Sequence, residues 1–142
     1  MVSYSFKKQF GEPILTRAKR QTIRAPRVKG PSRHARPGDK LQLYTGLRTQ
    51  YVRFLGEALC LRADPIALNF RSELIMIDGS IVRGSVDDFA RADGFAGWRD
   101  MEAFWKQEHP EVFTENEGIF SGYIISWGET LVPHIEGKEK SQ

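Results

Sequence analysis

The order of strand-like and helical segments restricts the fold more than any other feature of the chain. Segments that alternate polar and apolar residues or carry β-branched residues come early, at 20–24, 40–45, 51–61, 66–70 and 74–77. A short helix is expected at 8–18, and two later helices at 86–92 and 98–108 lead to a last strand at 119–127. Strands grouped before helices predict an α+β fold rather than a parallel α/β sheet.

The two later helices carry the clearest local signals. Trp98, Met101 and Trp105 fall on one helical face, which predicts that this face packs in the core. Ser85 is a predicted N-cap, because its hydroxyl can accept from the first free backbone N–H groups of a helix. Gly94 is a predicted C-terminal glycine, which ends the first of these helices.

A segment rich in proline and glycine, 25–39, separates the first two predicted strands. Three prolines and two glycines exclude regular structure there, and long loops in small domains are usually functional or mobile. The chain has 142 residues, the usual size of one domain. We therefore predict a single domain over 1–142, with a core at about 4–127, a basic loop at 25–38 and a frayed tail at 133–142.

Several classes of site are not indicated. Cys60 is the single cysteine and lies in an apolar run, so we expect a core residue rather than a nucleophile. No Cys and His residues have the spacing of a metal site, so neither a metal nor a cofactor is predicted. No segment resembles a signal peptide or a membrane span, which favours a cytoplasmic protein without a membrane partner. The oligomeric state stays open.

Charge is distributed unevenly along the chain. Residues 1–40 hold 11 Lys and Arg against 2 acids, whereas residues 87–142 hold 5 against 12. Such a basic first part favours an anionic partner such as RNA or a nucleotide. Two alternatives stay open, because the basic and acidic parts could face each other in the fold, or the loop could simply be solvated.

The basic region supplies the candidate ligand-binding residues. Phosphate contacts require cations of this kind and make binding sensitive to salt. The candidates are Arg17, Arg20, Arg24, Arg27, Lys29, Arg33 and Arg36. Aromatic residues do not alternate with them, so base stacking would come from elsewhere, and the candidates are Tyr44, Tyr51, Phe70 and Trp98.

The segment Lys19-Arg20-Gln21-Thr22-Ile23-Arg24 resembles the first signature of the ASCH superfamily, a strand of the form Lys-x-x-Thr-x-Arg that follows a short helix. The step at 37–41 and the Asp93-Gly94-Phe95 step before an aromatic helix resemble later parts of the same pattern. This resemblance covers about residues 4–127. It implies a PUA-like mixed β-barrel with short flanking helices and a cleft, which binds a nucleobase, nucleoside or RNA.

One branch of that superfamily removes the acetyl group from N4-acetylcytidine with a lysine, a threonine and a distant acid. The resemblance places Lys19, Thr22 and Asp93 on these three roles, and Arg24 on the arginine of the strand. The acid of that branch is a glutamate, so Asp93 is one methylene shorter.

The chemistry of these residue types is consistent with that role. A threonine hydroxyl is a weak nucleophile until a base takes its proton. A lysine is such a base only when burial or a nearby cation lowers its pKa, and Arg17, Arg20 and Arg24 are candidate cations. Side chains at i and i+3 lie on opposite faces of a regular strand. A helix end, bulge or turn at Lys19 is therefore needed to bring it to Thr22.

Three functions remain open from the sequence. The first is a binding module for RNA, a nucleobase or a nucleoside, with the basic region on the phosphates. The second, close behind, is an amidohydrolase that deacylates N4-acetylcytidine-type nucleosides with Thr22 as nucleophile, Lys19 as base and Asp93 as proton carrier. The third is a metal-independent ribonuclease. The enzyme requires Lys19, Thr22 and Asp93 to line one pocket within hydrogen-bond reach of a shared ligand, whereas the binding module does not.

Overall fold

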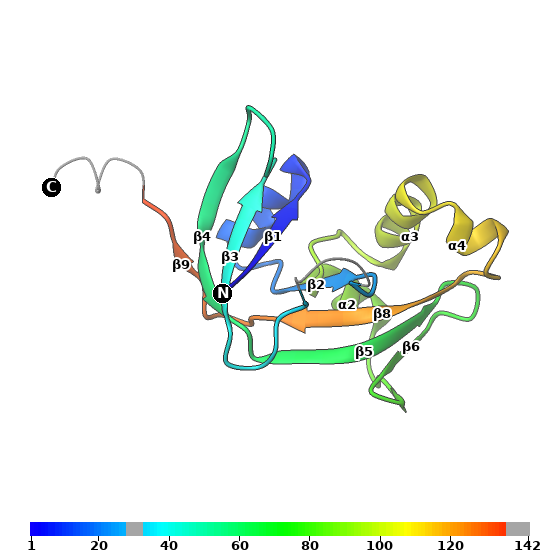
Figure 1. The fold of residues 1–142 in the computed structure, drawn as a ribbon. Helices are drawn as coiled ribbons and strands as arrows, with labels where there is room; N and C mark the ends of the chain where they lie inside the picture. The colour runs from blue at the N-terminus through cyan, green and yellow to red at the C-terminus, as the bar shows by residue number, and fades with distance from the viewer. Residues whose placement is uncertain (28–32, 136–142) are drawn as a thin grey trace, which may run out of the picture.

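Two separate β-sheets form the framework of the computed structural model, which describes residues 1–27 and 33–135. The first sheet has four strands in the order β1, β3, β4 and β9 (Figure 1). Their bounds are Val2–Phe6, Lys40–Thr45, Arg53–Leu59 and Val132–Pro133. The strands β1 and β3 are parallel, and the other pairs are antiparallel, so this sheet is mixed.

The second sheet has five strands in the order β2, β8, β5, β6 and β7, and every pair in it is antiparallel. Their bounds are Gln21–Arg24, Ile119–Ser126, Arg62–Asn69, Leu74–Ile77 and Ser80–Ile81. The long strand β8 pairs with β5 along its whole length and carries the short strand β2 on its other side. This places residues near the N-terminus beside residues near the C-terminus.

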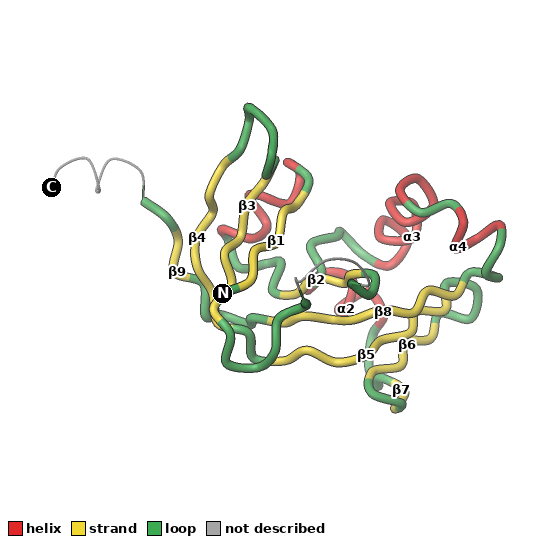
Figure 2. Tube along the Cα trace, viewed as in Figure 1, coloured by secondary structure: helices red, strands yellow, loops and turns green. Residues whose placement is uncertain are grey.

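Short helices lie at two places around these sheets. The 3₁₀ helix η1 (Lys8–Phe10) and α1 (Gly11–Leu15) follow β1, and Figure 2 shows them beside the four-stranded sheet. The others are α2 (Val86–Ala92), α3 (Trp98–Glu108) and α4 (Glu111–Thr114). In Figure 1, α3 and α4 stand on the side of β8 that also holds β2.

The predicted α+β class is confirmed, and several details are corrected. Backbone pairing does not join the two sheets into a closed barrel in the part of the chain that the structure describes, so the expected barrel is wrong there. The strands β1 and β9 were not expected from the sequence. The tail predicted to fray from residue 133 begins instead in a strand, because Pro133 pairs with Gly56 of β4. The rest of that tail, 136–142, lies outside the described residues.

The hydrophobic core includes residues from both sheets and from α3. Phe6 of β1 meets Trp127, just after β8, in an edge-to-face contact with ring centroids 6.1 Å apart. Trp98, Met101 and Trp105 are buried, as their spacing predicts. The core also includes Cys60, as expected.

The ends of α2 follow the predicted signals. The Ser85 hydroxyl accepts from the backbone N–H groups of Asp87 and Asp88, at 3.1 and 3.2 Å. Gly94 follows the helix with φ +97, a conformation that glycine adopts without the steric cost of a side chain. Among the described residues, no helix is both long and apolar enough to cross a bilayer.

Candidate active site

A cavity of about 320 Å³ opens between the N-terminal segment, β2 and α3. Four of its polar side chains come from two separate parts of the chain: Lys19, Thr22 and Arg24 around β2, and Asp93 after α2. Its apolar walls are Phe6, Phe10, Ile23, Phe95, Phe104, Trp105 and Phe120. The structure therefore brings the three predicted catalytic residues to one cavity.

Lys19 reaches the cavity because it lies in a turn and not in the strand. The chain between α1 and β2 turns at Arg17, whose φ is +68, and the Lys19 N–H donates to Pro13 O at 2.9 Å. The regular strand begins only at Gln21. This is the turn that the i, i+3 spacing of Lys19 and Thr22 requires.

The Lys19 ammonium group is buried against Asp93. Its Nζ atom donates to the Asp93 backbone oxygen at 2.5 Å and lies 3.6 Å from the Asp93 carboxylate oxygen Oδ1. Both side chains are almost fully excluded from water, with exposed fractions of 3% and 6%. A charged pair with so little solvent contact depends strongly on its few neighbours.

Gly94 provides the space for the lysine stem. A Cβ atom at this position would lie 2.8 Å from Lys19 Cδ and 3.1 Å from a Phe10 ring carbon. The left-handed backbone of Gly94 therefore has two effects: it ends α2, and it lets the lysine pass to the Asp93 backbone.

Thr22 and Arg24 lie on the same face of β2 because they are two residues apart in a strand. Arg24 Nε donates to Thr22 Oγ1 at 3.0 Å, and Arg24 Nη2 donates to Ser5 O at 2.7 Å. The arginine is thereby fixed between two strands from different sheets. The Thr22 hydroxyl accepts a charged hydrogen bond, and its own proton is left to donate.

Cations and aromatic rings alternate from the surface to the cavity. The Arg24 guanidinium lies 5.2 Å from the Tyr4 ring and 4.9 Å from the Phe6 ring. Lys19 Nζ lies 5.4 Å from the Phe6 ring and 4.8 Å from the Phe10 ring. Contacts of this kind stabilise cations that have lost their water, so the rings hold both side chains in position.

Burial shifts the ionisation of the buried pair in both partners. It lowers the pKa of Lys19, and the nearby Arg24 charge lowers it further, while Asp93 opposes the shift. Burial also raises the pKa of Asp93 from 3.8 to about 6, against the opposing effect of the Lys19 charge. The Gln21 amide lowers the Asp93 pKa slightly, although it makes no hydrogen bond of normal geometry to that carboxylate. A lysine and an acid shifted toward neutral pH are typical of proton-transfer sites.

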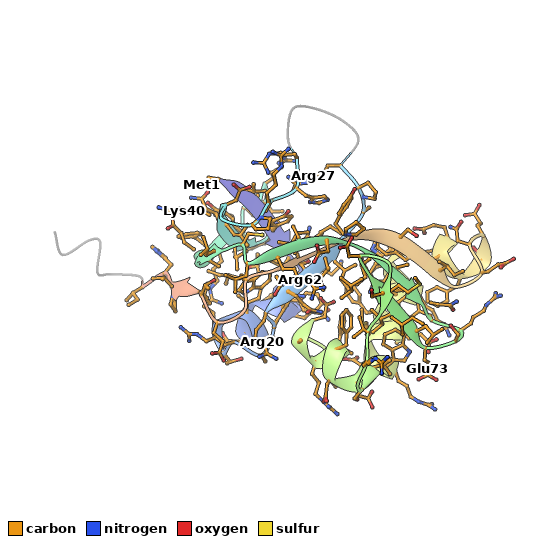
Figure 3. The ribbon with its side chains drawn as sticks, turned by 90° about the horizontal axis from the view of Figure 1, so that it is seen from below. Met1, Arg20, Arg27, Lys40, Arg62 and Glu73 are labelled. Carbon is orange, nitrogen blue, oxygen red and sulfur yellow. The ribbon has the colours of Figure 1, made fainter. Side chains whose placement is uncertain are left out.

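Most of the predicted basic residues do not reach this cavity. Arg24 lines it, whereas Arg17 donates to Leu131 O at 3.1 Å and Arg20 is exposed outside it. Figure 3 shows Arg20 and Arg27 on opposite edges of the molecule. These positions do not form one basic surface.

The arginines of the loop are bound within the fold. Arg27 packs over the Tyr4 ring at 4.9 Å and donates to Arg33 O at 3.1 Å. Arg33 forms an ion pair with Asp39 at 2.9 Å, and the same carboxylate accepts from the Arg36 N–H. Lys29, the remaining candidate, lies outside the described residues.

Several residues of the site were not predicted from the sequence. Ser5, Phe6 and Lys7 line the cavity from β1 and the residue after it, and Glu108 lines it from the end of α3. The alternation of apolar or aromatic residues with serines along Val2–Phe6 was the available signal, since a strand places every second residue inward. Of the expected stacking residues, Tyr44, Tyr51, Phe70 and Trp98 do not line this cavity.

The described residues contain no cluster of three or more His, Cys, Asp or Glu side chains that could hold a metal ion. The nearest pairing at the cavity rim is His109 with Glu111, whose Nδ1 and Oε1 atoms lie 3.7 Å apart.

The fold and the cavity define an α+β protein with a buried lysine–aspartate pair beside a threonine. No family model matches the chain, and no curated protein matches it in sequence. The chain is similar to a crystal structure of protein EF3133 from Enterococcus faecalis V583, which is assigned to family DUF984. The TM-score is 0.54 at 13% identity, and the alignment covers 95% of this chain and 81% of the other. At this identity the similarity shows the fold alone.

Proposed function

We propose that the cavity is an active site that hydrolyses the acyl group from the exocyclic amine of a nucleobase, with N4-acylated cytidine as the substrate class. The observation that carries this proposal is that Lys19, Thr22 and Asp93 line one cavity. This was the geometric condition that separates the enzyme from a binding module. The substrate class follows from the resemblance to the ASCH superfamily, whose PUA-like fold is part of the proposal.

The first step is attack by Thr22. Lys19, as the neutral amine, takes the hydroxyl proton while Thr22 Oγ1 forms a bond to the carbonyl carbon of the acyl group, and the π electrons of the carbonyl group move onto its oxygen. The lowered pKa of Lys19 favours the neutral form that this step needs. The Arg24 Nε–H group, 3.0 Å from Thr22 Oγ1, stabilises the negative charge that develops on this oxygen.

The remaining steps release the deacylated nucleobase and then the carboxylic acid. The carbon–nitrogen bond breaks, and Asp93 in its protonated form gives the departing amine its proton. Water then attacks the acyl ester of Thr22 and gives one proton to the Asp93 carboxylate. The ester bond breaks, the Lys19 ammonium group returns its proton to Thr22 Oγ1, and the carboxylic acid leaves. A pKa of about 6 lets Asp93 give and regain a proton near neutral pH.

The dimensions and walls of the cavity support a ligand of this size. A volume of about 320 Å³ lies within the range of small-molecule sites. Phe6, Phe10 and Phe104 form flat apolar surfaces against which a nucleobase can pack. Of the described loop arginines, Arg27 packs over the Tyr4 ring and Arg33 pairs with Asp39, and neither lines the cavity.

A binding module without chemistry is the second candidate, and one observation favours it. Lys19 Nζ already donates to the Asp93 backbone oxygen at 2.5 Å, as a purely structural lysine would. In that case the cavity would hold a nucleobase, and neither Lys19 nor Thr22 would transfer a proton. The ribonuclease stays a prediction from the sequence.

Turnover of N4-acetylcytidine by purified protein tests the proposal. We expect release of cytidine by the wild type and a loss of about 10²–10⁴-fold in kcat for Lys19→Met, the usual contribution of one proton-transfer group. Thr22→Val should abolish turnover, whereas Thr16→Val, which changes an exposed threonine near the site, should retain it. Near-ultraviolet circular dichroism shows whether each variant keeps its packing.

Two outcomes separate the candidates. If the wild-type protein binds cytidine but releases no cytidine from N4-acetylcytidine, the enzyme is excluded and the binding module remains as the function. Turnover that survives both Lys19→Met and Thr22→Val would show that these two residues do not carry the reaction.

A further inference from the structure

A second hollow adjoins the proposed active site. Its volume is about 860 Å³, and it lies between η1 and the connection from β3 to β4. Ser5, Phe6 and Lys7 line both this hollow and the cavity that holds Lys19. The two spaces therefore adjoin at the end of β1, where a ligand longer than a nucleobase can reach from one toward the other.

The charge of the second hollow differs from that of the first. Lys7, Lys8 and Arg53 line it, and no acidic residue does so among the described residues. The active-site cavity, in contrast, balances its cations with Asp93 and Glu108, among others. An electropositive hollow beside a balanced site attracts an anionic part of the ligand.

The cations of this hollow are available for a ligand. Lys8 forms no ion pair among the described residues. Arg53 faces Glu12 at 3.8 Å, but both side chains are exposed, so this contact contributes little and is readily replaced. Lys7 pairs with Glu108 at 3.0 Å across the mouth of the active-site cavity. An anion bound to Lys7 would compete with Glu108.

The β3–β4 connection gives the hollow a defined wall. Gly46 turns with φ +64, and a Cβ atom there would lie 3.0 Å from both Thr49 Oγ1 and Tyr51 O. The Thr49 hydroxyl donates to Gly46 O at 2.6 Å and accepts from the Tyr51 N–H at 3.1 Å. These bonds hold the connection in one shape, with the Tyr51 ring 79% exposed at the rim.

We propose that this hollow is the phosphate subsite of the same ligand, so that the substrate is a nucleotide rather than a free nucleoside. The inference rests on the proposed function and places the base in the first cavity and the phosphate on Lys8 and Arg53. It also moves the anion site from the proline-rich loop, whose Arg33 pairs with Asp39, to the opposite end of β1. The exposed Tyr51 ring covers the sugar side of the ligand.

Matched double variants test this assignment. Lys8→Ala/Arg53→Ala removes two cations from the hollow, and Lys40→Ala/Arg62→Ala removes two exposed cations outside it. Both variants change the net charge equally. Each double variant also removes one surface ion pair: Arg53 with Glu12 in the first, and Arg62 with Asp64 in the control. The probes are cytidine and cytidine 5′-monophosphate in calorimetric titrations, and their N4-acetyl forms in turnover.

We expect the wild type to bind the monophosphate at least about tenfold more tightly than the nucleoside, the effect of one charge-assisted hydrogen bond. The Lys8/Arg53 variant should lose this preference but keep its affinity for cytidine, and the Lys40/Arg62 control should keep the preference. The preference should also fall as salt is raised.

The outcomes separate this inference from the function on which it rests. Cytidine binding and nucleoside turnover without any gain from the phosphate would overturn the nucleotide inference and leave the proposed function intact. A gain seen only with an oligonucleotide, or one that the Lys40/Arg62 control loses equally, would also overturn it. Protein that binds neither cytidine nor its monophosphate would overturn both.

Discussion

Replacing Asp93 with asparagine should make the protein relatively more stable as the pH rises from about 4 to about 7. Asp93 is buried, and its pKa in the folded state is raised from 3.8 to about 6. Between these two values the folded protein holds a proton that the unfolded chain releases. The contribution of Asp93 to stability is therefore fully present below about pH 4 and is lost as the pH rises through about 6.

The size of the effect follows from the shift. Each pKa unit corresponds to about 1.4 kcal/mol, so a rise of about two units costs about 3 kcal/mol once the carboxyl group has ionised. Asparagine has nearly the same shape and does not ionise in this range. The free energy of unfolding of Asp93→Asn, minus that of the wild type, should thus increase by about 3 kcal/mol between pH 4 and pH 7.

Urea denaturation at half-unit steps of pH measures this difference directly. Asp78→Asn is the matched control, since it makes the same substitution at an exposed turn position. The Asp93 charge raises the pKa of Lys19, so the substitution lowers that pKa further. A lysine whose pKa is lowered in the folded state makes the protein gain stability as the pH rises. This effect therefore adds to the predicted increase for Asp93→Asn.

A difference between wild type and Asp93→Asn that stays constant from pH 4 to pH 7 would refute the reasoning. It would mean that the Asp93 carboxyl group ionises in the folded protein as it does in water. A shift of the same size in Asp78→Asn would also refute it, because the effect would then not depend on burial.

Two further predictions concern the segments that hold Asp93. Gly94→Ala should lower the midpoint of urea denaturation more than Gly84→Ala does, because both glycines have positive φ but only Gly94 would bring a Cβ atom against Lys19. Equal losses would show that the strain of a positive φ alone causes the loss of stability, without a contribution from the contact with Lys19. Ser85→Ala should cost about 1 kcal/mol in thermal or urea unfolding, because it removes the hydroxyl that caps α2. An unchanged stability would show that water replaces the cap.

Local signals predicted the helices α2 and α3 with accurate bounds. The spacing of Trp98, Met101 and Trp105 and the caps at Ser85 and Gly94 depend on neighbours within a few residues, so they can be read from the sequence. The strands β1 and β9 depend on distant partners instead. Val2–Phe6 pairs with β3 about forty residues later, and Pro133 pairs with Gly56, which no local pattern indicates.

The site was predicted in part for the same reason. The resemblance to a known motif identified Lys19, Thr22 and Asp93, and the structure brings them to one cavity. The charge count could not show that the Arg33 side chain pairs with Asp39. Nor could it place Lys8 and Arg53 on either side of one hollow, because that arrangement depends on how β1 meets the β3–β4 connection.

The buried Lys19–Asp93 pair is unfavourable for the stability of the fold, and this bears on the role of the cavity. An apolar pair of similar volume is often as stable as a buried ion pair, or more stable. Here Asp93 Oδ1 is buried without a hydrogen-bond partner in the described structure, and Lys19 reaches it only beside a glycine in a left-handed conformation. Burial raises the pKa of Asp93 to about 6, so ionisation of this carboxyl group at neutral pH weakens the fold. Packing does not require such an arrangement, and the proposed proton transfer between Lys19, Thr22 and Asp93 gives a reason for it.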